Sequence, residues 1–181
     1  MIAGARECQV PHKVDFDLVF EADDFRNRFL DGREDHEGFD AIEKEARNFL
    51  TTYTWCPPVE GVYVGCYCPP VVAVFAYKVE KSPPIGIDST DILEWIWVVA
   101  GDLPPAYLIN EEITDALVAL AGYTAVASDW VKAVEGGDTV DDFVYFDLPA
   151  DKEHAAMLRP RIDLLKQHFL YVERPPLFPG I

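Results

Sequence analysis

The chain has 181 residues, of which 32 are acidic and 15 basic, so its net charge at pH 7 is −17. Half of the residues are hydrophobic and 13% are aromatic, which excludes an intrinsically disordered chain and predicts one domain with a sizeable core, residues 173–181 forming an extended tail. The electric field of a chain with this charge repels nucleic acid and anionic membranes. It favours a basic protein as partner.

The first 58 residues are predicted to contain a strand and two helices. Apolar residues alternate with mostly polar ones over 14–20, a strand pattern. In "ADDFRNRFLDG" Asp23 or Asp24 can cap a short helix that stops at Gly32. "REDHEG" then has the composition of a charged loop. From Phe39 apolar residues recur at helical spacing, and Pro57 with its neighbour excludes a longer helix.

The middle of the chain is predicted to be a sheet. "GVYVGCYC" and "VVAVFAYKVE" are rich in β-branched and aromatic residues, and their short connection predicts adjacent antiparallel strands. The run 92–99 is almost entirely apolar, as in a central strand that is covered on both faces.

Two helices are predicted to follow. Residues 111–135 show one long apolar stripe, with Asn110 as the expected cap and Gly136-Gly137 as the end. "FVYFDLP" is a candidate edge strand. The last helix contains Pro160, where we expect a kink or a restart. The order of elements predicts an α+β fold, with a mostly antiparallel sheet of about four to five strands packed against a long central helix and a C-terminal helix.

The chain has few of the residue patterns that announce a catalytic or metal site. Cys66 and Cys68 face the same way in a strand, but no second closely spaced pair completes a zinc site, so ordinary buried thiols are expected. No phosphate-binding glycine loop or nucleophile motif is present, and we predict neither a metal nor a cofactor.

Asp102 is the candidate for a binding residue because it follows a buried strand, at "WIWVVAGDLPPAY". With Trp97 and Tyr107 it would form an aromatic and acidic pocket suited to a cation. A turn in which the carboxylate accepts hydrogen bonds from its own backbone is the structural alternative. A third interpretation is a buried ion pair between Asp102 and either Arg159 or Arg161.

The same stretch resembles the central motif of a family of small uncharacterised bacterial proteins, W-x-x-x-G-D-L-P-x-x-Y, followed by a long helix and an Arg-x-Arg segment. The matching residues run from Trp97 to Tyr107, with Trp130 in the long helix and "LRPRIDLL" (158–165) near the end. Pro160 departs from that pattern. The resemblance covers residues 70–170 and implies a single bacterial, cytosolic domain without implying an activity.

No stretch has the about 18 to 20 uninterrupted apolar residues of a membrane helix, and the first ten residues are not a secretory signal, so a cytoplasmic protein is expected. The leading hypothesis is a non-enzymatic acidic domain that binds a basic protein, as an immunity protein or antitoxin does. The alternative is a small-molecule-binding protein or enzyme with a pocket around Asp102 and Tyr107. A third is a homo-oligomer in which Leu177, Phe178 and Ile181 dock on a neighbour.

Overall fold

The computed structural model describes residues 14–82, 93–109, 112–140, 148–173 and 177–178. One sheet contains five antiparallel strands in chain order: β1 (Phe20–Glu21), β2 (Val59–Cys68), β3 (Val72–Ser82), β4 (Leu93–Ala100) and β5 (Ala106–Leu108). Each strand pairs with the next, so the sheet is a simple meander. The predicted α+β fold and antiparallel sheet are confirmed.

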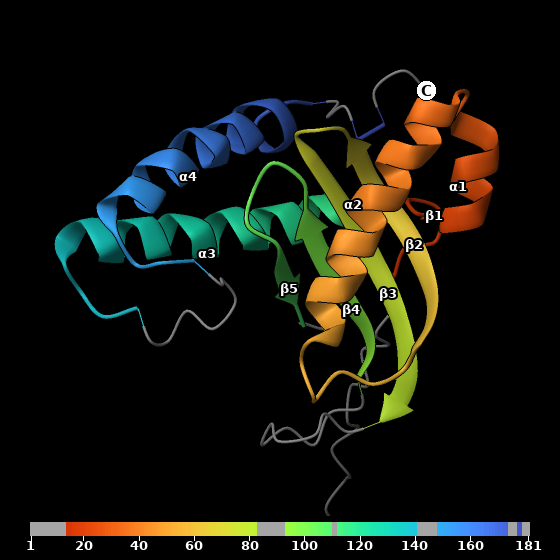
Figure 1. Ribbon diagram of the computed structural model, residues 1–181, viewed down its shortest axis with the longest axis horizontal. Helices are drawn as coiled ribbons and strands as arrows, with labels where there is room; N and C mark the ends of the chain where they lie inside the picture. The colour runs from red at the N-terminus through yellow and green to blue at the C-terminus, as the bar shows by residue number, and fades with distance from the viewer. Residues whose placement is uncertain (1–13, 83–92, 110–111, 141–147, 174–176, 179–181) are drawn as a thin grey trace, which may run out of the picture.

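Helices cover both faces of this sheet (Figure 1). On one face lie α1 (Ala22–Phe29) and α2 (Arg33–Thr51). On the other lie α3 (Ala116–Gly136) and α4 (Lys152–Leu165), which continues into a π-helical turn, η1 (Lys166–Leu170). The molecule therefore has three layers.

Each face of the sheet has its own hydrophobic core, because successive side chains of a strand point to opposite sides. From β3, Phe75 and Tyr77 pack toward α1 and α2, whereas Val74 and Ala76 pack toward α3 and α4. In β2 a register shift between Val64 and Cys66 changes which residues face which core. The face of the sheet to which a side chain points therefore decides which other side chains it can contact.

The expected strand over 14–20 is wrong except for its last residue. Only Phe20 and Glu21 pair with β2, while the Asp17 amide donates to Asp15 Oδ1 at 3.0 Å and the Leu18 amide donates to the Asp15 carbonyl at 3.0 Å. Asp15 thus forms a local turn that competes with strand pairing, which the alternating pattern does not show.

The "REDHEG" segment is helical, contrary to the prediction of a loop, and Gly32 is the N-cap of α2 and not the end of α1. Neither Asp23 nor Asp24 caps α1, which begins at Ala22 after Glu21. The charges of this segment stabilise a helix start. Glu34 and Asp35 lie in the first turn, where the helix dipole favours anions, and Arg33 pairs with Glu37 one turn later.

Helix α3 begins later than predicted, at Ala116, because Asp115 is the cap. The Asp115 carboxylate accepts hydrogen bonds from the amides of Leu117 and Val118 at 2.8 and 3.0 Å. The predicted cap, Asn110, lies outside the described residues. The predicted end is confirmed, since Gly137 has a φ of 78° and closes the helix in the left-handed conformation.

Among the helices of the described residues, α3 is the one with the length and mean hydropathy of a membrane span. Its buried side chains, among them Leu120 and Trp130, belong to the core between the sheet and α4. This is also how the core helix of a globular domain packs.

The C-terminal helix runs through Pro160 without a break, so the predicted restart is wrong. Proline lacks the backbone donor that would bind the Ala156 carbonyl. The Arg161 guanidinium donates to the neighbouring Met157 carbonyl at 2.9 Å. The candidate strand in "FVYFDLP" falls mostly on residues 141–147, outside the described part of the chain.

Two residues of the expected tail pack on their own chain. The Tyr67 amide donates to the Leu177 carbonyl at 2.8 Å. The Phe178 ring lies 5.3 Å from that of Phe20 and 5.5 Å from that of Phe25. Leu177 and Phe178 are therefore partly buried on their own chain, and Ile181 lies outside the described residues.

Candidate functional site

The turn that follows β4 is built around Gly101, which has a φ of +130°. A Cβ atom at this position would lie 2.7 Å from the Val71 carbonyl oxygen and 2.9 Å from Val72 Cα. The next residue, Asp102, donates its amide to the Pro70 carbonyl at 2.9 Å. The glycine therefore lets the turn pack directly on the connection between β2 and β3, and this packing positions the Asp102 side chain.

Asp102 pairs with Arg161 of α4, one of the two predicted partners. Arg161 Nη2 lies 3.0 and 3.1 Å from the two carboxylate oxygens, and its Nε donates to the Asp102 backbone carbonyl at 2.6 Å. The Arg161 side chain is 38% exposed and that of Asp102 66%, so the predicted burial of the pair is wrong. Arg159 pairs with Glu135 of α3 instead.

Trp97 and Tyr107 lie on opposite faces of the sheet. In the β4–β5 pair Trp97 is opposite Leu108, and Tyr107 is opposite Val98, which differs from Trp97 by one position. Trp97 is buried against α3, where its Nε1 donates to the Ile113 carbonyl at 3.0 Å. The predicted pocket residues therefore do not converge with Asp102.

Tyr107 belongs to a cluster of aromatic rings on the α2 side. Its ring centroid is 4.9 Å from that of Tyr53 and 4.9 Å from that of Trp55, and Phe49 completes the group. Rings at these separations are in direct contact, so no cation fits between them. This cluster packs one end of the sheet against the end of α2.

Of the two strand cysteines, Cys66 is buried as predicted and Cys68 is only partly buried. Cys66 is fully buried, and burial raises the pKa of its thiol well above the usual range. Cys68 and Cys56 are partly buried, and all three are free thiols. Within the part of the chain that the structure describes, no group of three or more histidine, cysteine or acidic residues is placed to hold a metal ion.

The α1–α2 side of the sheet is acidic. Residues 20–51 contain ten acidic and five basic residues, a net charge of −5 with histidine neutral. In α2 the exposed positions include Glu34, Asp35, Glu37, Asp40 and Glu45. We call the surface formed by residues 20–51 the acidic face.

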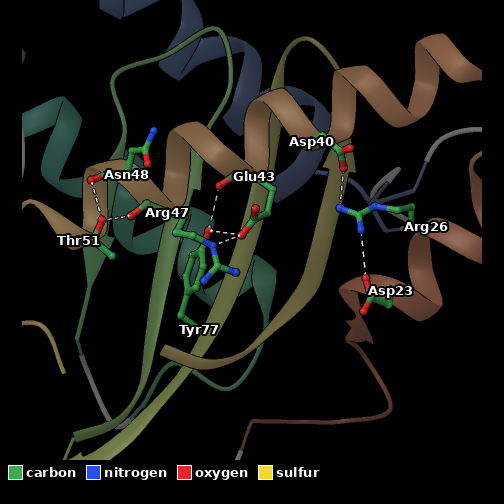
Figure 2. A network of polar contacts seen from close by, with 8 residues as sticks. All are labelled: Asp23, Arg26, Asp40, Glu43, Arg47, Asn48, Thr51 and Tyr77. Carbon is green, nitrogen blue, oxygen red and sulfur yellow. Dashed lines mark hydrogen bonds and ion pairs between the residues drawn. The ribbon is translucent and has the colours of Figure 1, made fainter. Parts of the chain in front are cut away.

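The arginines of the acidic face are held by ion pairs within it (Figure 2). Arg26 of α1 binds Asp23 at 3.1 Å and Asp40 of α2 at 2.5 Å, and its guanidinium carbon lies 5.2 Å from the centre of the Phe39 ring. The guanidinium is thereby fixed between the two helices and neutralises carboxylates of its own chain.

A second group of contacts fixes α2 on β3 (Figure 2). Arg47 Nε donates to Glu43 Oε1 at 2.9 Å, and its guanidinium carbon lies 5.7 Å from the centre of the Tyr77 ring. The Tyr77 hydroxyl donates to the Glu43 carbonyl at 3.3 Å. Burial, followed by the charge of Glu43, raises the pKa of Tyr77 above its usual range.

Between α1, α2 and the start of β2 the acidic face is hollowed by an open concavity of about 290 Å³. Four carboxylates line it against two guanidinium groups: Glu21, Asp23, Glu43 and Glu60 with Arg26 and Arg47. Val59 and Val62 supply apolar surface. The lining is therefore negative overall, with apolar surface beside the charges.

The negative field of the acidic face also acts on Tyr67. Burial is the main cause that raises the pKa of this phenol, and the charges of Asp35 and Asp40 raise it further. The same field would attract a cation to this surface.

Prediction from the sequence did not identify the acidic face as a site, although the "REDHEG" run within it is a visible signal. The prediction of a charged loop for this run does not show that it lies on the outward side of a helix. Comparison of the chain with models of known protein families, with curated proteins and with solved structures finds no match.

Proposed function

We propose that this protein is a non-enzymatic, acidic protein-binding domain that engages a basic protein surface through its acidic face. The density of charge carries this proposal: residues 20–51, which form β1, α1 and α2, hold ten acidic and five basic residues on one side of the sheet. Complementary charge accelerates the encounter of two proteins and fixes their relative orientation.

The internal ion pairs support a binding role because they determine which carboxylates stay available. Arg26, Arg33 and Arg47 pair with acidic residues of their own face. Glu34 and Glu45 have no ion pair with another described residue and are exposed. The net negative charge of the face is therefore carried by carboxylates such as these two.

The concavity of the acidic face is a suitable receptor for a lysine or arginine side chain of that partner. Three of its four carboxylates pair with Arg26, Arg47 and Lys78, so the fourth, Glu21, would bind the charged end. Val59 and Val62 would contact the aliphatic stem. A basic side chain that is anchored in this way resembles the anchors that contribute most of the free energy at many interfaces.

An immunity protein or antitoxin of a bacterial toxin is the class that we propose, acting in the cytoplasm without a cofactor. An acidic inhibitor can cover the basic cleft with which a nuclease binds its substrate. The alternative of a small-molecule pocket around Asp102 and Tyr107 gains no support from their positions, because Arg161 binds Asp102 and Tyr107 packs on the other side of the sheet.

Affinity capture from the producing organism tests the proposal. The bait variant Asp31→Asn/Glu34→Gln/Glu45→Gln removes three negative charges from the acidic face. The matched control, Asp129→Asn/Asp138→Asn/Asp163→Asn, removes three from exposed positions on the α3–α4 side.

At 50 mM salt we expect the wild type and the control variant to retain the same basic protein, identified by mass spectrometry, and the acidic-face variant to lose it. Retention at 500 mM salt should be weak for all three, since salt screens exposed charges. Failure to retain any basic protein, or equal losses from both variants, would overturn the proposal.

A further inference from the structure

We draw no further inference here: the strongest candidate, the open concavity at the turn before β1, where the half-exposed Phe16 ring packs against Tyr63 and Trp95, carries nothing because it is an apolar surface between two exposed aspartates and nothing in the structure shows what covers it.

Discussion

Replacing Gly101 with alanine should destabilise the protein more than most single substitutions at a turn. Two effects contribute. A φ of +130° is strained for any residue with a Cβ and costs about 1–3 kcal/mol. The new Cβ would also overlap backbone atoms, at 2.7 Å from the Val71 carbonyl oxygen, and relieving such overpacking costs about 1–3 kcal/mol more.

The sum, about 2–6 kcal/mol, is a large part of the 5–15 kcal/mol by which a typical domain is stable. Urea unfolding followed by tryptophan fluorescence measures it, because Trp97 and Trp130 are buried in the core on the α3 side. We expect a lower midpoint with an unchanged slope.

Gly38→Ala is the control for this experiment. Gly38 lies within α2, and a Cβ there would be no closer than 3.8 Å to its nearest neighbour, the Tyr67 hydroxyl oxygen. Alanine should stabilise the helix by about 0.5–1 kcal/mol. If Gly101→Ala unfolds within about 1 kcal/mol of the wild type, the turn does not need a glycine and its geometry is wrong.

Substitutions at Asp115, Arg161, Asp102 and Cys66 test local contacts. Asp115→Ala should cost about 1 kcal/mol by removing the α3 cap, and Asp115→Asn should cost much less; equal losses in urea unfolding would contradict the cap. Arg161→Ala should lower the melting temperature more than Asp102→Asn, because Arg161 also binds two backbone carbonyls; the reverse order would contradict this network. Cys66 should resist iodoacetamide at pH 8 in the folded protein and react in urea, as mapped by mass spectrometry; labelling of the folded protein would contradict its burial. Because burial raises the pKa of the folded Cys66 thiol above the ordinary value of 9.0, its contribution to stability is complete below pH 9 and is lost as the pH rises further; this loss should be absent in Cys66→Ala.

The sheet was predictable because its three long strands are apolar, β-branched runs bounded by prolines and turns. β5 was not, since three residues carry no periodic signal and pair with β4 only through the turn at Gly101. The early start of α2 was missed because a run of charges is typical both of a loop and of a helix start whose ion pairs are one turn apart.

The candidate site was predicted in part. The chemistry of a carboxylate and a guanidinium was enough to name Arg161 as one of two partners for Asp102. The separation of Trp97 and Tyr107 was not accessible, because it depends on the register of the β4–β5 pair, and a shift by one residue exchanges the two faces. Predicting the acidic face requires knowing that α1 and α2 lie together on one side of the sheet.

The central claim is tested most directly by stopped flow at several salt concentrations. This experiment measures the rate constant for association with the basic protein that we expect the affinity capture to identify. Between 50 and 500 mM salt the rate constant of the wild type should fall at least tenfold, as expected for steering by exposed charges. At 50 mM salt Asp31→Asn/Glu34→Gln/Glu45→Gln should associate several-fold more slowly than Asp129→Asn/Asp138→Asn/Asp163→Asn. A rate constant that does not depend on salt, or that is equal in the two variants, would contradict a binding role of the acidic face.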